Sequence, residues 1–166
     1  MELLQVFDEN KNMLNESIER ALKKELPEGK YFMIILLFIQ NDEGKFLIQK
    51  TSENRDSEYA TTGGHVSFGD DAIKTTIKEA KEELGITLNK DEIVEIETVT
   101  IKCCHVAVYY CKKNIDINEL KIQTDEVENF YWMSPDEIDT LINENKFRKS
   151  NIEPYKKVLK INNSNS

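Results

Sequence analysis

The chain has 166 residues, of which 39% are hydrophobic and 32% charged, enough for one folded domain with its own core. Its 22 basic and 31 acidic residues give a formal net charge of −9, which argues against binding to duplex nucleic acid. The longest apolar run (33–39) is too short for a membrane span, no secretory signal is recognisable, and three cysteines without paired spacing indicate a reducing, cytoplasmic location.

The N-terminal half alternates apolar runs with turn residues. Its predicted elements are a strand at 3–7, a helix at 15–24, and strands at 31–40, 45–50 and 59–62. The turn at 41–44 predicts a hairpin over 31–50, and the nearly continuous apolar run at 31–40 predicts a strand that is buried on both faces. We expect 1–29 to form a strand and helix extension of a single domain that spans 1–166.

The C-terminal half begins with a helix at 71–84 and continues with one long or two adjacent strands over 93–112. The apolar stripe of that helix is formed by Ile73, Ile77, Ala80 and Leu84, with Gly85 at its end. A second helix begins at Ser134, where Pro135 and Glu137 complete the start signals, and a last helix covers 153–161 before a frayed tail at 162–166. Interleaved strands and helices without regular crossovers favour an α+β fold, with helices packed on a mixed sheet.

Three acidic residues recur at helical spacing within the helix at 71–84. Glu79, Glu82 and Glu83 stand at positions i, i+3 and i+4, which places three carboxylates on one face within a turn. Such like charges repel one another unless a cation neutralises them. Clustered oxygen ligands beside the irregular loop of Gly63 and Gly64 suit Mg²⁺, with Mn²⁺ as the alternative. A solvated acidic face that is paired with neighbouring lysines is the other interpretation.

The segment from Gly63 to Ile86 resembles the signature of the Nudix (MutT-like) hydrolase family, G-x5-E-x7-R-E-U-x-E-E-x-G-U with U aliphatic. Counted from the second glycine, the matching positions are Gly64, Glu79, Glu82, Glu83, Gly85 and Ile86. Three further positions carry residues of similar character to those of the pattern: Asp70 for Glu, Lys78 for Arg, and Ala80 for a larger aliphatic residue. The spacing has no gap.

The resemblance covers roughly residues 30–142, because the order of the predicted elements is also similar to that of the family. A strand that contains Trp132 runs into the helix capped by Ser134, and the segments 8–10 and 26–29 look like the branch that includes isopentenyl-diphosphate isomerases and their hydrolase relatives. This resemblance implies an α/β/α sandwich around a mixed sheet. Proteins of this kind commonly form dimers, so a homodimer stays open.

The activity that the resemblance implies is Mg²⁺-dependent hydrolysis of the diphosphate bond in a nucleoside diphosphate linked to another group. Carried over by position, Glu79, Glu82 and Glu83 and the carbonyl of Gly63 would hold the metal, and one glutamate would act as base. A fourth carboxylate, Glu126, is the candidate from outside the motif, with Asp125 and Glu128 as competitors. We expect Gly64, His65 and Arg55 to contact the phosphorylated small-molecule substrate. Asp70 and Lys78 would orient the glutamates, less rigidly than Glu and Arg.

Two alternatives stand beside hydrolysis. An isopentenyl-diphosphate isomerase is disfavoured, because that branch has a catalytic cysteine where this chain has Gly63, and no histidine precedes His65. A nucleotide-binding module with weak turnover is suggested by the departures from the pattern at Asp70 and Lys78, although a pure binder does not need three mutually repelling carboxylates. The identity of the diphosphate substrate is not readable from the sequence.

Overall fold

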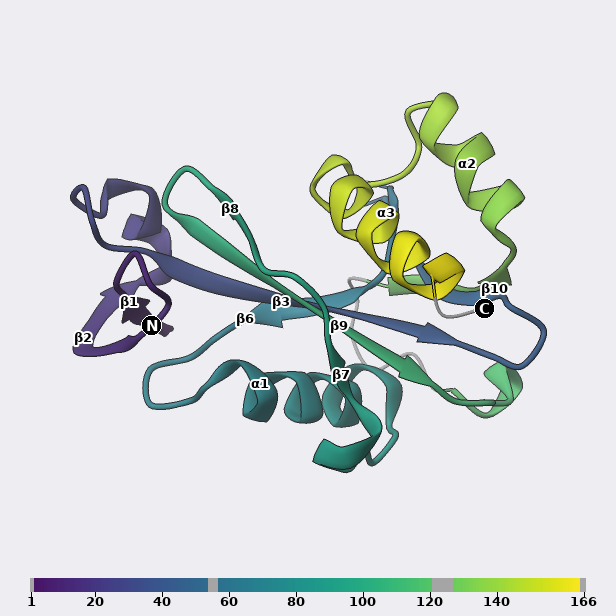
Figure 1. The fold of residues 1–166 in the computed structure, drawn as a ribbon, viewed down its shortest axis with the longest axis horizontal. Coiled ribbons are helices and arrows are strands. Elements are labelled where there is room, and N and C mark those ends of the chain that lie inside the picture. Colours follow the sequence, from purple (N-terminus) through teal and green to yellow (C-terminus); the bar gives the residue numbers. More distant parts are fainter. Residues whose placement is uncertain (1, 54–56, 121–126, 165–166) are drawn as a thin grey trace.

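A computed structural model describes residues 2–53, 57–120 and 127–164 of the chain (Figure 1). Its strands are β1 (Leu3–Phe7), β2 (Met13–Glu19), β3 (Phe32–Gln40), β4 (Phe46–Thr51), β5 (Tyr59–Ala60), β6 (Thr62–His65), β7 (Val94–Glu95), β8 (Val99–Ile101), β9 (Cys104–Lys112) and β10 (Val127–Met133). Its α-helices are α1 (Ala72–Glu79), α2 (Pro135–Asn143) and α3 (Lys149–Ser164). Shorter helical segments are η1 (Arg20–Glu25), η2 (Ala80–Leu84), η3 (Lys90–Glu92) and η4 (Ile117–Glu119).

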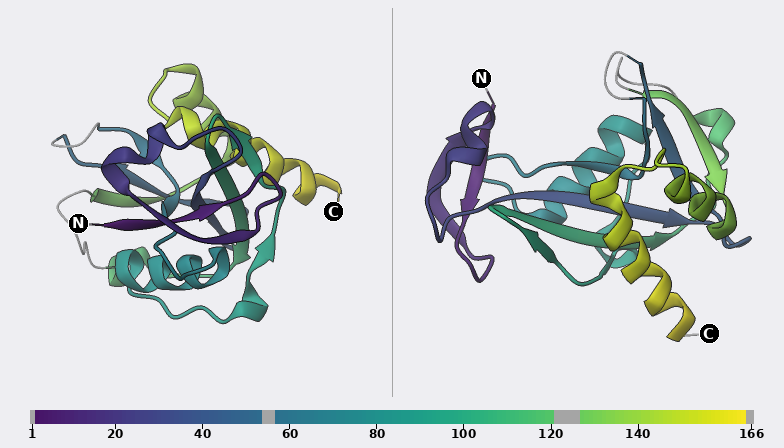
Figure 2. Two further views of the ribbon diagram at one scale, coloured as in Figure 1. Left: turned by 90° about the vertical axis from the view of Figure 1, so that its left-hand side faces the viewer. Right: turned by 90° about the horizontal axis from the view of Figure 1, so that it is seen from above.

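The molecule is a three-layer sandwich, with α1 on one side of the central sheet and α2 and α3 on the other (Figures 1 and 2). The sheet has the order β10-β4-β3-β9-β7, with β5 paired to β4, β6 to β3 and β8 to β9. Strands β3 and β9 run parallel, and the other described pairs are antiparallel. The predicted α+β sandwich with a mixed sheet is therefore confirmed. None of the described helices is long and apolar enough to cross a membrane.

Strand β3 is buried on both faces, as its nearly continuous apolar sequence predicts. Ile35 and Leu37 belong to a core cluster on the α1 side that also contains Ala80 of η2. Phe38, on the opposite face, belongs to a second cluster with Tyr155 of α3. Because successive side chains of a strand point to opposite faces, one strand supplies both cores.

The predicted hairpin over 31–50 forms only at its closed end. Strands β3 and β4 pair through Gln40 and Phe46, and beyond that point they separate. Strand β6 then occupies the edge of β3, where Ile35 pairs with Gly64, while β4 pairs with β10 and with β5. The sequence showed two adjacent strands and a turn, but not that later segments compete for the edges of both.

The N-terminal extension corrects one prediction, because the expected helix at 15–24 is a strand followed by a short 3-10 helix. Strand β2 pairs antiparallel with β1 through contacts such as Ile18 with Leu4, and η1 begins only at Arg20. Residues 14, 16 and 18 are half-buried and those between them exposed or nearly so, which is the period of a strand. The extension lies against one end of the sheet (Figure 2), where backbone bonds from Gln5 to Val66 hold it.

The helix predicted at 71–84 is present as α1 and η2, and its buried face contains Ala80 and Leu84 of the expected stripe. Thr75, Thr76 and Ala80 are buried, whereas Ile73 and Ile77 are only half-buried. A threonine hydroxyl can be buried here because it donates to the carbonyl four residues earlier, as Thr76 does to Ala72 at 2.8 Å. Gly85, with φ of 72°, ends the segment in the left-handed region, as predicted.

The C-terminal helices follow the predicted order with one shift in bounds. Ser134 caps α2 in a reciprocal box with Glu137, as its sequence predicts. Helix α3 begins at Lys149, earlier than the predicted 153, and continues to Ser164 through the start of the segment that we expected to fray. The Asn162 side chain donates a hydrogen bond to Gln40 at 2.9 Å, which fastens this end of α3 to the sheet.

Candidate active site

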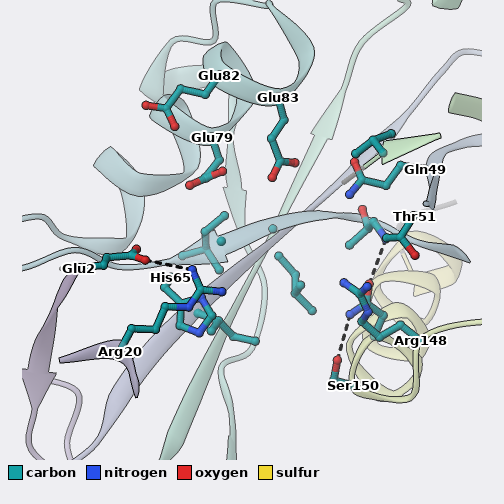
Figure 3. Close-up of a pocket in the computed structure, with 18 residues that line it drawn as sticks. Glu2, Arg20, Gln49, Thr51, His65, Glu79, Glu82, Glu83, Arg148 and Ser150 are labelled. Atoms are coloured by element: carbon teal, nitrogen blue, oxygen red, sulfur yellow. Dashed lines mark hydrogen bonds and ion pairs between the residues drawn. The ribbon is translucent and has the colours of Figure 1, made fainter. Parts of the chain in front are cut away.

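A cavity of about 310 Å³ lies between α1, the strands β3, β4 and β6, the N-terminal extension and the start of α3 (Figure 3). Its lining residues are Glu2, Arg20, Ile34, Ile35, Leu36, Gln49, Thr51, Thr61, Gly63, Gly64, His65, Glu79, Glu82, Glu83, Val127, Arg148, Ser150 and Asn151. The cavity contains side chains of both β3 and β4, so it occupies the place where these strands separate. All three glutamates of the motif and the Gly63-Gly64-His65 segment line it together.

The two glycines of β6 are required by close approach. A Cβ atom on Gly64 would lie 2.5 Å from the Cδ and Oε1 atoms of Glu79, so the missing side chain makes room for this carboxylate. A Cβ atom on Gly63 would instead lie 2.7 Å from the backbone oxygen of Ile35 in β3. The glycine pair therefore allows β6 to press against both the sheet and the acidic helix. Gly63 and Gly64 are brought to the site, and their proposed contacts to metal and substrate stay predictions.

The carboxylates lie where the helix changes its winding. Helix α1 ends at Glu79, and the wider π-type turns of η2 carry Glu82 and Glu83. Wide turns of this type inside helices are frequent at functional sites. Figure 3 shows Glu79 and Glu83 directed into the cavity, with Glu82 at its outer side. The sequence spacing thus predicted the grouping of the three side chains, but not the wider winding.

Burial raises the pKa of Glu79, and the negative charge of the nearby Glu82 raises it further. A hydrogen bond with the carboxyl group of Glu83 and the charge of Lys78 act in the opposite direction on the pKa. Two carboxyl groups in hydrogen-bonding contact must share a proton or a cation. The pair of Glu79 and Glu83 is therefore suited to hold positive charge between its oxygens.

The carboxylates of Glu79, Glu82 and Glu83 are the candidate ligands for a divalent cation. Among the described residues no group of three or more His, Cys, Asp or Glu side chains is gathered closely enough to hold a metal ion as it stands. Glu79 and Glu83 are already in contact, and Glu82 is exposed, so a change of its side-chain rotamer is the movement that a third ligand requires. The donors are all oxygen, which suits Mg²⁺ or Mn²⁺.

Asp70 and Lys78 meet beside the cavity without lining it. The Lys78 ammonium lies 4.0 Å from the Asp70 carboxylate, and 55% of the Lys78 side chain is exposed. This is a weak, single-point ion pair of the kind that contributes little to folding stability. Lys78 also acts on the motif through its charge, which lowers the pKa of the neighbouring Glu79. The geometry brings the predicted orienting pair together, and its orienting role stays a prediction.

His65 joins the site to the N-terminal extension. Its Nε2 atom lies 2.7 Å from the ammonium of Lys23 in η1, and its ring stacks on Phe32 with centroids 5.9 Å apart. Arg20 of the same extension lines the cavity and pairs with Glu2 at 3.0 Å. The extension therefore forms one wall of the cavity. Arg20 was not among the predicted site residues, because 15–24 has the composition of a helix and nothing in it indicates which segments lie beside it.

The opposite end of the cavity is formed by residues that sequence analysis did not single out. Gln49 and Thr51 of β4 lie there with Arg148, which precedes α3 (Figure 3). A signal was present in the sequence, since Gln49 and Thr51 share a strand face with Leu47, which belongs to the core on the α1 side. Polar residues on a core-facing register indicate a site. Arg148 carries no such local signal, because it reaches the cavity from nearly a hundred residues further along the chain.

Two predicted site residues fall outside the described part of the chain. Arg55 belongs to 54–56 and Glu126 to 121–126. Thr51 and Val127, which both line the cavity, are the nearest of its lining residues to these two segments along the chain. Contact of Arg55 with substrate and a catalytic role for Glu126 therefore remain predictions.

Comparisons with known proteins agree with the fold and the motif. The NUDIX domain family matches residues 30–157. An uncharacterized Nudix hydrolase of Yersinia pestis is 26% identical over 148 residues, which cover 83% of this chain and 76% of that protein. Among solved structures, a protein of Deinococcus radiodurans has a TM-score of 0.71 at 17% identity, covering 91% of this chain and 94% of its own. A MutT NUDIX hydrolase of Burkholderia pseudomallei has a TM-score of 0.63 at 18% identity, covering 76% and 97%.

Proposed function

This chain belongs to the Nudix family, and we propose that it hydrolyses, with Mg²⁺, the diphosphate bond of a nucleoside diphosphate linked to another group. Nudix hydrolases act in general on small phosphorylated substrates that contain pyrophosphate, and they generally use divalent metal ions. One observation carries the finer proposal. Glu79, Glu82 and Glu83 line a single cavity, and the carboxylate of Glu79 rests directly on Gly64.

The residues that would hold Mg²⁺ are the three glutamates and the backbone carbonyl of Gly63. When bound, the ion offsets charge on the diphosphate and makes a coordinated water more acidic. The oxygen of the attacking water forms a bond to phosphorus, the bridging P–O bond breaks, and the water proton passes to a carboxylate. The proton acceptor would be whichever of the three glutamates the ion does not fully engage.

Positive charge on the extension side of the cavity suits the substrate. Arg20 lines that wall and offers a planar guanidinium to phosphate oxygens, with Glu2 as its partner in the structure. The Lys23 ammonium at the edge of His65 adds a second cation near the same wall. These groups would orient the diphosphate beneath the glutamates. We retain His65 and Gly64 as proposed substrate contacts because both line the cavity.

An isomerase is less well supported. The resemblance to that branch implies a catalytic thiol, but the described lining residues of the cavity include no cysteine. The three cysteines of the chain are free thiols, and all of them lie outside the cavity. Burial raises the pKa of Cys104 to about 11. Free thiols accord with the proposed cytoplasmic location.

The test is product formation from a panel of nucleoside diphosphate derivatives in the presence of Mg²⁺, followed by chromatography. Glu82→Gln is expected to lower kcat/KM by about 100-fold or more while leaving the melting temperature unchanged. The matched control is Glu43→Gln, the same change in an exposed turn outside the cavity, which is expected to behave as wild type. Equal turnover by wild type and Glu82→Gln would contradict the metal-site proposal.

Chelation gives an independent check. EDTA is expected to abolish turnover, and an excess of Mg²⁺ is expected to restore it. Turnover that persists in EDTA would contradict the proposed mechanism. If no compound is hydrolysed but a nucleotide raises the melting temperature, the protein is a binding module and the departures from the pattern at Asp70 and Lys78 explain the lost rate.

A further inference from the structure

Gln49 is a buried polar residue whose amide oxygen is left without a hydrogen bond. Only 7% of the residue is exposed, and its Oε1 atom has no partner among the described residues. The residue nevertheless lines the cavity and is directed toward it in Figure 3. A buried acceptor without a donor costs about 1–3 kcal/mol. A donor from a bound molecule would remove this cost.

The position of Gln49 in β4 does not require a polar side chain for the stability of the fold. On the α1-facing side of β4, Gln49 follows Leu47, a buried core residue, and it pairs across the sheet with Phe130 and Ala60. An aliphatic side chain at this position would continue the core without an unsatisfied oxygen. Thr51, the next residue on the same face, exchanges hydrogen bonds with the backbone of Glu58 at 2.8 and 3.1 Å, so its hydroxyl serves the fold.

The surroundings of Gln49 are polar and include a cation. The Arg148 side chain lies beside Thr51 and Ser150 at this end of the cavity (Figure 3). The apolar lining residues are aliphatic, namely Ile34, Ile35, Leu36 and Val127, and the described lining residues include no Phe, Tyr or Trp. This end of the cavity therefore offers a hydrogen-bond acceptor and a guanidinium, rather than the extended hydrophobic surface that an alkyl chain needs.

We propose that Gln49 and Arg148 form a subsite for a hydroxylated substituent of the substrate, such as a sugar or ribose phosphate, and that they select it over an alkyl diphosphate. The Gln49 oxygen accepts a hydrogen bond from a hydroxyl of this substituent, and Arg148 binds an anionic oxygen of the phosphate that carries it. This inference rests on the proposed diphosphate hydrolysis, of whose glutamates Glu83 lies on the side of the cavity toward Gln49 (Figure 3). Gln49 is thus a specificity-determining residue, not a catalytic one.

The test compares ADP-ribose, which carries hydroxyls on both sides of its diphosphate, with isopentenyl diphosphate, which carries none. Gln49→Leu removes the acceptor at similar size and is expected to raise KM for ADP-ribose about tenfold, the effect of one lost hydrogen bond, with kcat changed far less. The KM for isopentenyl diphosphate is expected to stay the same or fall. Gln49→Met serves the same purpose if the Leu variant does not fold.

The matched control is Gln40→Leu, the same change on β3 outside the cavity, where the lost bonds are those to Tyr110, Asn162 and Gly44. It is expected to alter the melting temperature but not the ratio of the two kcat/KM values. An unchanged ratio in folded Gln49→Leu would overturn the inference, as would an equal loss with both diphosphates, which would mark a structural role.

The outcome separates this inference from the proposed function. If wild type hydrolyses neither compound, the panel of nucleoside diphosphate derivatives still tests the hydrolase proposal, and calorimetric binding of both compounds with Mg²⁺ tests the subsite alone. Tighter binding of ADP-ribose that is lost in Gln49→Leu supports the subsite. Equal binding of both compounds, or preference for isopentenyl diphosphate, contradicts it.

Discussion

The two faces of the central sheet are built from the same strands for different purposes. On the α2 and α3 side, Phe46 and Ile48 of β4 join an apolar core in which Tyr155 contacts the rings of Phe38 and Phe46 at centroid distances of 6.3 and 5.7 Å. On the α1 side, Leu47 continues that pattern, but Gln49 does not, and the cavity opens there. The first face supplies stability, and the second combines a core with the cavity of the proposed active site.

Tyr155 Oη on the first face and Gln49 Oε1 on the second are both buried polar oxygens without a hydrogen-bond partner among the described residues. Of these two residues Gln49 lines the cavity and Tyr155 does not, so the Gln49 oxygen is the one placed to meet a bound molecule. A buried oxygen without a hydrogen-bond partner is therefore expected to have a different consequence on each face. Substitutions that remove each group should separate them, because the hydroxyl of Tyr155 can affect only stability whereas Gln49 affects substrate choice.

The largest effect in this comparison is expected for Gly64→Ala. The new Cβ atom would lie 2.5 Å from the Glu79 carboxyl group, which is the flexible end of a side chain, so the carboxylate moves instead of the backbone. Displacement of a catalytic carboxylate should lower kcat/KM by about 100-fold, while the free energy of unfolding changes by about 1 kcal/mol or less. Steady-state kinetics and urea unfolding measure the two quantities.

Gly63→Ala is the matched control, because its Cβ atom would lie 2.7 Å from the Ile35 carbonyl oxygen, a backbone atom that cannot rotate away. We expect Gly63→Ala to lose more stability than Gly64→Ala. Retained activity in folded Gly64→Ala would show that the contact between Gly64 and Glu79 does not position the carboxylate.

The intermediate effect belongs to Tyr155→Phe on the opposite face. Tyr155 is fully buried among aromatic rings, and burial raises the pKa of its hydroxyl group. Removing a buried hydroxyl that lacks a partner should raise the free energy of unfolding by about 1–2 kcal/mol, with kcat/KM unchanged. Denaturant unfolding checks the first expectation. A loss of stability would mean that the hydroxyl has a partner, and the contrast with Gln49 would then fail.

The same contrast explains how much of the molecule its sequence predicts. The acidic helix, its end at Gly85 and the capped start of α2 were predicted, because each depends on residues within a few positions of one another. The grouping of the glutamates beside the loop of Gly63 and Gly64 was predicted from their helical spacing, and the resemblance of the whole segment to the Nudix motif supported it. Local periodicity and a long ungapped motif thus predicted the half of the cavity that holds the glutamates and the glycines.

The other half of the cavity was not predicted, because it is assembled over long distances in the chain. Arg20 arrives on an extension whose strand β2 has helix-forming composition, so pairing with β1 outweighed local propensity. Arg148 arrives from the start of α3, and β4 reaches the cavity only after leaving β3. Gln49 and Thr51 carried a local signal, because they are polar residues on the face of β4 that Leu47 directs to the core.

The smallest effect is expected for Lys78→Arg, which probes the edge of the reactive face. Lys78 and Asp70 are 4.0 Å apart and partly exposed, so their pairing contributes little to stability in either form. A guanidinium can hold a carboxylate through two bonds, whereas an ammonium is a single point charge. We therefore expect kcat/KM to stay the same or rise by about threefold, with the melting temperature unchanged. A large fall in kcat/KM would show that the lysine has a role of its own, whereas a large gain in stability would place this pair with the structural face of the molecule.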